Sequence, residues 1–515
     1  MQHPPSPARH VGAAGRRAVR AAPPAFAVAL ALACAPLAHA AMGTDTPHGS
    51  SLDWKPCTQV AAEWDAKDTA TECAMVEVPL EYGSPDGRLT RVAISRIKAS
   101  DPAQRQGVLL INPGGPGVEG LTAPKDVLSG EMRALGAHFD LIGFDIRGTG
   151  HSDKPGCPQL AADTIPRPPA HITGKERSKL LDAAYGQALA ECAGKDPAFS
   201  QSMTTPNAAR DMDRIRAALG EEKVSYLGNS WGTALGASYR SQFDSRVQRM
   251  VFDSVLASWQ SVDENEAQVA ATQRRFENFA AWIAERHDRL HLGDSATQVS
   301  KKLLNLRTEL ETHPHEGVSA EAFNTYLTSP RAHWASNAHK LSEISAGRAP
   351  EPTPRPALAP SPTNGPGSGF GQPLQDGDLE FVLRAFNCNG ATGQRTFENH
   401  WQQSLTLQQK YPVAGYTNAN ITQCSGWPFA GQREQLAKGT SPLQLFGHST
   451  ETNTPLPWAE QMKDTIGGSL SIINDDVHSS LPHLTTPAHD AVAFLTGHSE
   501  PSHRTYDGSP IPDLH

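Results

Sequence analysis

Short apolar runs alternate with helical patterns between about residues 73 and 256. Two of these runs are continuous enough to predict buried central strands, one alternates, one contains a proline, and two more complete the set. The runs span residues 74–80, 91–97, 108–112, 139–145, 224–227 and 250–252. This alternation predicts an α/β fold, a mostly parallel sheet with helices on its faces. Pro79 cannot donate to a strand ladder, so we expect the first run to be an edge strand.

A well-marked helix is predicted over residues 205–219. Its apolar positions recur at helical spacing and therefore share one face. Thr205 can cap its start, Pro206 suits its first turn, and Gly220 can end it.

The pattern changes between about residues 258 and 430. This part is polar and rich in helical patterns, and it contains a Pro/Gly/Ser stretch over 349–373 that predicts a loop or linker. Strand patterns return at 443–447 and 470–474, which we expect to be the last two strands, with a helix at 459–466 between them. The sequence thus predicts one α/β domain, 41–257 and 431–515, interrupted by a helical cap insertion over 258–430.

The N-terminal 40 residues have the pattern of a signal peptide. Arginines precede the apolar run 25–33, and Ala38-His39-Ala40 forms a small-x-small cleavage site. The run is too short for a transmembrane helix, and no other stretch is long and apolar enough to span a bilayer. Two variants stay open, a lipoprotein anchor at Cys34 and a weak twin-arginine signal at Arg16-Arg17.

Cysteine content and charge agree with an exported globular chain. Six cysteines remain after Cys34, and they allow 15 pairings. Proximity in sequence favours Cys57–Cys73, Cys157–Cys192 and Cys388–Cys424. The spacing of Cys and His predicts no metal site. The net charge of -9 does not resemble a nucleic-acid-binding footprint.

The strongest chemical signal is Gly228-Asn229-Ser230-Trp231-Gly232, between a predicted strand and a helix rich in small residues. In this context the pattern indicates a nucleophile elbow, a sharp turn that exposes a serine hydroxyl at the carboxyl edge of a sheet. The two glycines leave room where side chains would clash with neighbouring elements. Ser230 is therefore the candidate nucleophile, and the Trp231 amide can face the oxyanion that forms on attack.

A glycine-rich loop, Asn112-Pro113-Gly114-Gly115-Pro116-Gly117, follows the predicted central strand. Such a loop can bring a backbone amide close to the nucleophile, and Gly115 is the candidate for the second oxyanion donor. A phosphate-binding loop is the competing interpretation, but the Gly-Lys-Ser/Thr ending is missing. A plain turn is the remaining alternative.

Together these motifs resemble the tripeptidyl aminopeptidase group of α/β-hydrolases, which is related to the proline iminopeptidases. The resemblance rests on the glycine-rich loop, the elbow, and the segment Gly143–Ser152 between them, and it covers nearly all of the mature chain. It implies an exported enzyme with a helical cap that releases di- or tripeptides from free N-termini through a Ser-His-Asp triad. We interpret Asp145 and Arg147, within that segment, as a structural ion pair or turn.

The candidate base is His478, which follows the last predicted strand, where the family keeps its histidine. The chain order serine, acid, histidine is the one this fold requires. A neutral imidazole would take the serine proton and return it to the leaving amine. His483 and His448 are the competing candidates.

The acid is where this sequence departs from the family. The family has Gly-Glu-x-Asp-Pro-x-Thr-Pro followed by Trp-Ala, whereas this chain reads Gly447-His448-Ser449-Thr450-Glu451-Thr452-Asn453-Thr454-Pro455. Aligning Thr454-Pro455 places Glu451 on the aspartate, and a glutamate can orient the histidine. Asp253, after the strand at 250–252, is the alternative acid. Asp475 and Asp476 are interpreted as turn residues.

The resemblance implies peptide substrates with a free N-terminus and no cofactor. A carboxylate should bind the substrate ammonium, and Asp263, Glu264 and Glu266 are candidates, although a solvated helix start is the alternative. Competing functions are an esterase or amidase, a proline iminopeptidase, or an inactive binding protein that retains the fold. The peptide length released, the residue preference and the oligomeric state are left open by the sequence.

Overall fold

Alternate residues of the central strands pack against two different hydrophobic cores, as expected for a sheet covered on both faces. Leu109 and Ile111 face a core that includes residues of α1 (Ala123–Ser129) and α15 (Thr485–Leu495). Val108 and Leu110 face the opposite core, to which α5 (Thr205–Ala218), α6 (Trp231–Phe243) and α14 (Leu456–Ile466) contribute. The sheet therefore forms the middle of three layers.

The structure is a computed structural model that describes residues 52–514, apart from 170–171, 173, 258–265, 314–317, 351–375, 394, 418–421 and 423. The predicted signal peptide, Cys34 and most of the Pro/Gly/Ser stretch lie outside the described residues. The strands are β1 (Lys55–Pro56), β2 (Thr71–Pro79), β3 (Leu89–Ile97), β4 (Val108–Asn112), β5 (Asp140–Phe144), β6 (Val224–Asn229), β7 (Val247–Asp253), β8 (Leu443–His448), β9 (Ser469–Asn474) and β10 (Thr505–Asp507).

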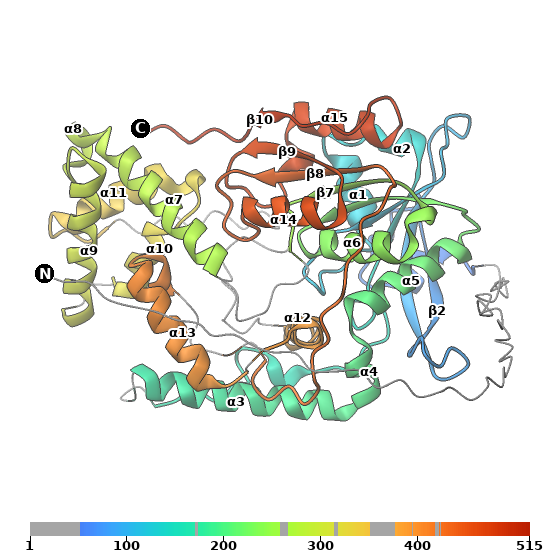
Figure 1. Cartoon of the computed structure of the whole chain (residues 1–515), viewed down its shortest axis with the longest axis horizontal. Helices are drawn as coiled ribbons and strands as arrows, with labels where there is room; N and C mark the ends of the chain where they lie inside the picture. Colours follow the sequence, from blue (N-terminus) through green and yellow to red (C-terminus); the bar gives the residue numbers. More distant parts are fainter. Residues whose placement is uncertain are drawn as a thin grey trace, which may run out of the picture. The chain divides into compact units, whose positions relative to one another are not determined.

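The strands form one sheet in the order β1-β2-β3-β5-β4-β6-β7-β8-β9-β10. Pairing is antiparallel from β1 to β5 and parallel from β5 to β10, so the predicted mostly parallel sheet is confirmed. Figure 1 shows β7, β8 and β9 side by side. Because parallel strands share one carboxyl edge, the chain segments after β4, β6, β7, β8 and β9 converge there.

Two predictions about strands need correction. The strand at 470–474 is not the last, because β10 adds to β9 in parallel; its three residues are too short to give a hydrophobic pattern. The strand β2 is second in order rather than outermost, because β1 pairs with Glu72 and Cys73. Among the described residues, no strand pairs with the outer side of the rest of β2, which includes Pro79.

The predicted helix at 205–219 is confirmed as α5, but its cap is Thr204 rather than Thr205. The Thr204 hydroxyl accepts a hydrogen bond from the Asn207 amide at 3.3 Å. Thr204 has extended backbone, as a capping residue requires, whereas Thr205 already lies inside the first turn. Ala209, Met212 and Ile215 are buried on one face of this helix.

Residues 276–344, between β7 and β8, supply most of a separate hydrophobic core, whereas the buried hydrophobic residues within 381–388 belong to a core of the sheet. Phe279, Trp282 and Trp334 pack together in the separate core, with the rings of Phe279 and Trp334 stacked at 5.2 Å. The helices of this part are α7 (Glu266–Ala284), α8 (His287–Leu290), α9 (Ala296–Thr312), α10 (Ala320–Leu327), α11 (Trp334–Ser345), α12 (Gly377–Gly390) and α13 (Phe397–Lys410). The other helices are α2 (Leu135–His138), α3 (Gly174–Lys195) and α4 (Pro197–Ser202). We call α7 to α13 the cap helices.

The three favoured cysteine pairings are confirmed. Disulfides join Cys57 to Cys73, Cys157 to Cys192, and Cys388 to Cys424. The last of these fixes the end of α12 to a segment that precedes β8. The sequence separations are 16, 35 and 36 residues. In the chain-entropy description each such closure stabilises the folded state by about 3 to 4 kcal/mol.

Candidate active site

Ser230 lies in the sharp turn between β6 and α6, at the carboxyl edge of the sheet. Its backbone has φ 54° and ψ -126°, a region that residues with a side chain rarely adopt. The Ser230 amide donates to the Asp253 carbonyl at 3.0 Å, and Thr233 donates to the Ser230 carbonyl from both its amide and its hydroxyl. These bonds hold the strained turn, and the half-buried Ser230 keeps part of its surface open to solvent.

Both glycines of the elbow are required by close backbone packing. A methyl group at Gly232 would lie 2.7 Å from the Asn112 carbonyl oxygen of β4. One at Gly228 would lie 2.6 Å from the Tyr226 ring and 2.7 Å from the Gly232 carbonyl oxygen. Real side chains do not approach backbone so closely, so the pattern Gly-x-Ser-x-Gly follows from the packing of this turn.

The glycine-rich loop after β4 touches the elbow through Gly114. A methyl group there would lie 2.6 Å from the Asn229 carbonyl oxygen, 3.0 Å from Ser230 Cβ and 3.2 Å from the Trp231 amide nitrogen. Gly114 has φ 103° and Gly115 has φ 109°, which favour glycine at both positions. The loop thus lies against the candidate nucleophile, and Gly115, chosen from the sequence, is the next residue after the contact.

His478 and Glu451 are brought together by the ends of β9 and β8. His478 Nδ1 and Glu451 Oε1 form a hydrogen-bonded ion pair. The Glu451 side chain is 1% exposed, whereas that of His478 is 24% exposed. Since Glu451 occupies Nδ1, the other ring nitrogen of His478 is the one left for a reacting group.

The Glu451 carboxylate is satisfied by further donors. Its Oε1 accepts from the Thr454 hydroxyl at 2.7 Å and the Thr454 amide at 3.2 Å, and its Oε2 accepts from the Ser254 hydroxyl at 3.0 Å. Burial opposes ionisation of Glu451, but the charge and hydrogen bond of His478 lower the pKa of Glu451 to about 2. Burial likewise opposes protonation of His478, yet the Glu451 carboxylate raises the pKa of His478 above 6.5.

Ser254, which we did not single out from the sequence, links the three segments. Its hydroxyl donates to Glu451 and accepts from the Ser479 amide at 2.8 Å. Ser254 follows Asp253, whose carbonyl holds the Ser230 amide. Ser230, Ser254 and Ser479 all have positive φ, and the described residues contain one other such non-glycine residue, His291 in the cap helices. The signal that could have found Ser254 is its place as the second polar residue after the predicted strand at 250–252.

Asp253, the alternative acid, has another partner. Its Oδ1 lies 2.9 Å from His448 Nε2, and its Oδ2 accepts from the Leu481 amide at 3.2 Å. His448 Nδ1 lies 2.7 Å from Asp475 Oδ1, and the His448 side chain is 0% exposed. His448 is therefore enclosed and cannot meet a substrate. Asp475 is a turn residue, as we expected, since its Oδ1 accepts from the Val477 amide at 3.4 Å, and it is in addition a buried partner of His448.

Arg275 of α7 also escaped sequence reasoning. Its Nη2 donates to the Thr452 hydroxyl at 2.6 Å, and its Nε lies 3.5 Å from Asp476 Oδ2. Asp476 also accepts from the Arg331 amide at 2.8 Å. One cap side chain thus contacts the segments that carry both Glu451 and His478. An arginine on a predicted helix gives no sequence signal of such a distant contact.

The sequence of this chain matches known proteins over most of its length. Residues 107–347 match the family described as alpha/beta hydrolase fold, and residues 411–504 match the family described as TAP-like protein. A tripeptidyl aminopeptidase of Streptomyces coelicolor is 32% identical over 450 residues, which cover 84% of this chain and 80% of that protein. The chain belongs to the tripeptidyl aminopeptidase family of α/β-hydrolases. It is a serine peptidase.

Another relative matches about half of this peptidase in sequence, and a solved structure matches most of its length. The serine protease Hip1 of Mycobacterium tuberculosis is 32% identical over 242 residues, which cover 46% of each chain. A proline iminopeptidase structure from Mycobacterium smegmatis matches with a TM-score of 0.38 and 14% identity, covering 82% of this chain and 98% of that one.

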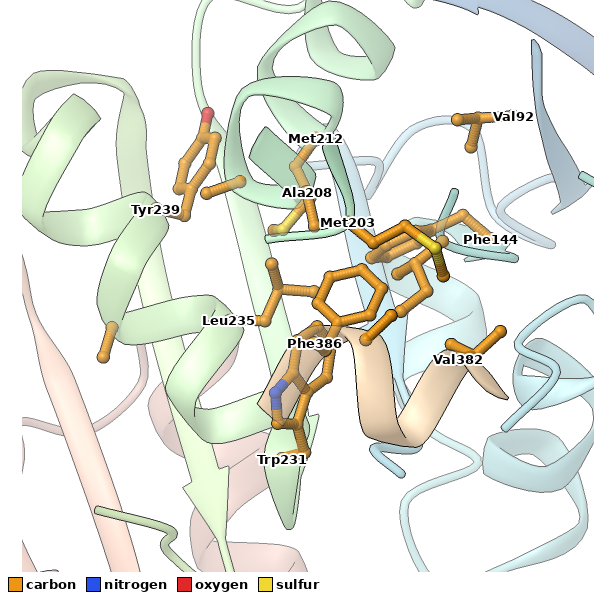
Figure 2. Packing of buried hydrophobic residues seen from close by; sticks show 14 of the residues in the cluster. Val92, Phe144, Met203, Ala208, Met212, Trp231, Leu235, Tyr239, Val382 and Phe386 are labelled. Carbon is orange, nitrogen blue, oxygen red and sulfur yellow. The ribbon is translucent and has the colours of Figure 1, made fainter. Parts of the chain in front are cut away.

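The helix α12 of the peptidase covers both the glycine-rich loop and the elbow. A methyl group at Gly117 would lie 2.9 Å from side-chain atoms of Leu379 and Val382. The Phe386 and Trp231 rings meet edge to face at 5.2 Å (Figure 2). The elbow of the peptidase is therefore packed on a cap helix as well as on the sheet.

The segment between loop and elbow is structural, as we interpreted it, but the two charged residues do not pair with each other. The Asp145 carboxylate accepts from the amides of Gly120 and His151 at 2.7 and 2.9 Å. Arg147 is fully buried and pairs with Asp211 of α5 at 2.6 Å. These contacts hold the loops of the peptidase in place.

The proposed ammonium-binding carboxylates find no support in the described part of the peptidase. Glu266, at the start of α7, is exposed and accepts from Lys410 Nζ and from the Tyr411 hydroxyl. Asp263 and Glu264 lie outside the described residues. In the part of the chain that the structure describes, no cluster of His, Cys, Asp and Glu could hold a metal ion. In that same part, no helix combines the length and hydropathy needed to cross a bilayer.

Proposed function

We propose that this serine peptidase is an exported aminopeptidase that releases di- or tripeptides from substrates with a free N-terminus. The observation that carries the proposal is the ion pair of His478 and Glu451, at the same sheet edge as the strained Ser230 turn. Similarity to a tripeptidyl aminopeptidase over four-fifths of that protein supports the peptide substrate. Three disulfides support an oxidising destination, and the N-terminal pattern supports export.

Acylation begins with attack of the Ser230 hydroxyl oxygen on the scissile carbonyl carbon. His478 takes the serine proton on the ring nitrogen that Glu451 leaves free. Glu451 holds the ring in one tautomer and stabilises the imidazolium, a role that its ionised, buried state suits. The amides of Trp231 and Gly115 donate to the oxyanion.

The tetrahedral intermediate then collapses. His478 gives its proton to the leaving amine, the C–N bond breaks, and the N-terminal fragment stays as an ester on Ser230. Water then takes the place of the amine, and its oxygen attacks the ester carbonyl carbon while His478 takes one of its protons. The second tetrahedral intermediate collapses by breaking the bond between that carbon and the Ser230 oxygen, which receives the proton from His478, and the short peptide leaves as a free acid.

The test compares Ala-Pro-Ala-p-nitroanilide with its N-acetylated form on the mature enzyme. We expect cleavage of the free-amine substrate alone, and loss of that activity in Ser230→Ala by at least about 10⁴-fold. The exposed Ser129→Ala variant is the matched control. Cleavage of p-nitrophenyl esters with neither peptide cleaved would replace the peptidase proposal by an esterase.

A further inference from the structure

A second histidine lies behind the candidate triad, fully enclosed between two carboxylates. His448 ends β8, three residues before Glu451. Its Nε2 lies 2.9 Å from Asp253 Oδ1 at the end of β7, and its Nδ1 lies 2.7 Å from Asp475 Oδ1 just after β9. The ring therefore connects the carboxyl ends of three neighbouring parallel strands.

When Asp253 and Asp475 are both ionised, these contacts require both ring nitrogens of His448 to carry a proton. Ionised carboxylates only accept hydrogen bonds, and a neutral imidazole has one donor. Two carboxylate contacts at hydrogen-bond distance are thus satisfied together only by the imidazolium cation. The remaining oxygens have other donors, the Leu481 amide on Asp253 and the Ser480 hydroxyl on Asp475, at 3.2 and 2.9 Å.

Asp253 and Asp475, whose carboxylates hold His448, also hold the segments of the candidate triad through their backbone carbonyls. The Asp253 carbonyl accepts from the Ser230 amide at 3.0 Å. The Asp475 carbonyl accepts from the Thr450 amide and hydroxyl at 3.0 and 2.9 Å, next to Glu451. Displacing His448 would loosen the turns that bear the nucleophile, the acid and the base.

We propose that His448 is a positioning residue, a fixed buried cation that clamps Asp253 to Asp475 and so sets the geometry and proton affinity of His478. The inference rests on the proposed function, because it assumes that His478 is the base. His448 touches no reacting atom, and it acts through Asp253, Asp475 and the turns that they hold.

The charge of His448 acts on the pKa of His478, in addition to any packing role of its ring. Burial opposes its protonation, but Asp253, Asp475 and Glu451 together raise the pKa of His448 well above 6.5. The groups that face it are these three carboxylates, Ser480 and His478. Its positive charge lowers the pKa of His478, against the effects of Glu451 and Asp253, which raise it. His448 thereby keeps His478 closer to the pKa of a useful base.

The experiment measures kcat and KM against pH for wild type and His448→Gln, with both p-nitrophenyl acetate and Ala-Pro-Ala-p-nitroanilide. We expect kcat to fall by about 10- to 100-fold with KM changed by less than about 3-fold. The acid limb of kcat/KM should move upward by roughly half a pH unit to one unit, because a cation near His478 is lost. His489→Gln, 61% exposed on α15, is the matched control.

A fall in activity with no movement of the acid limb would reduce His448 to a structural residue and overturn the proposal. The ester separates this outcome from failure of the proposed function. If wild type cleaves the ester but not the peptide, the aminopeptidase assignment falls, and the acid limb on the ester still decides the role of His448.

A second measurement serves if His448→Gln does not fold. Nitrogen-15 NMR is recorded on the histidine rings of a variant that carries both His151→Gln and His478→Gln. These changes remove the other two histidines whose pKa is raised among the described residues. We expect one ring to keep protons on both nitrogens at about pH 9. A spectrum in which every ring has lost a proton at that pH would overturn the proposal.

Discussion

The two sides of the candidate active site are built by different means. On the nucleophile side, β4, β6 and α6 approach so closely that Gly114, Gly228 and Gly232 have no room for a methyl group. On the acid–base side, the ends of β7, β8 and β9 are joined by buried charges, above all Glu451 with His478. The first side is held by backbone shape and the second by electrostatics, so the two should fail in different ways.

Among substitutions outside the candidate triad, the largest expected effect is on the nucleophile side. Gly114→Ala places a methyl group 2.6 Å from the Asn229 carbonyl oxygen, at a residue with φ 103°. The loop must move away from Ser230 and Trp231, and we expect kcat to fall by about 10²- to 10³-fold, as for loss of an oxyanion donor. Steady-state kinetics on the p-nitroanilide measures it.

Gly220→Ala is the matched control, because Gly220 also has positive φ (74°) but open space around its Cα. It should cost about 1 kcal/mol of folding free energy with kcat unchanged. Equal activity of the two variants would mean that close approach of the loop does not matter.

A smaller effect is expected where the cap meets the acid–base side. Arg275→Met removes the cation from buried Asp476 and the donor from Thr452. The segments that carry Glu451 and His478 both lose a support. We expect kcat to fall by about 10- to 100-fold, since small misplacements of catalytic groups are costly.

The control for this variant is Arg348→Met, also in the cap region but 59% exposed, which should keep wild-type kcat. Equal kcat in Arg275→Met and wild type would show that the cap does not support the triad.

The smallest expected effect is on stability against pH. The pKa of Glu451 is lowered from 4.5 to about 2, so its contribution to stability is present above pH 4.5 and is lost as the pH falls toward 2. His478 acts in the opposite direction: its raised pKa stabilises the fold below pH 6.5, and this part is lost as the pH rises through the folded value.

Urea unfolding of wild type and Glu451→Gln between about pH 5 and pH 3 checks the acid side. We expect wild type to lose more stability than the variant over this range. Parallel losses in the two proteins would mean that Glu451 does not titrate with folding.

The same contrast explains what could be predicted from the sequence. The elbow, the glycine-rich loop and the strands around them are local patterns of a few residues, so their places in the fold were predictable. The His448–Asp253 contact joins residues 195 positions apart, and no local sequence pattern at either residue predicts the contact. For the same reason Asp475 could be predicted as a turn residue, but its contact with His448 could not.

Glu451 lies between these cases. Its position came from aligning Thr454-Pro455 with a family motif, and the same Thr454 turns out to hydrogen-bond the Glu451 carboxylate. Ser254 and Arg275 were missed, because their contacts depend on how β7, β8, β9 and α7 meet in space. The strand β10 was missed because its three residues are too short to give a hydrophobic pattern. The cap was assigned to Thr205 instead of Thr204 because the two neighbouring residues are both threonines.

The most direct test of the account is whether Glu451 controls the reactivity of Ser230 through His478. The measurement is the rate of fluorophosphonate labelling of Ser230 against pH, in wild type and Glu451→Gln, with Ser230→Ala as the blank. We predict that labelling in wild type rises through a midpoint above pH 6.5. In Glu451→Gln it should be slower by about 10³- to 10⁴-fold, with a lower midpoint. Equal rates and equal midpoints in the two proteins would contradict the assignment of Glu451 as the residue that orients the base.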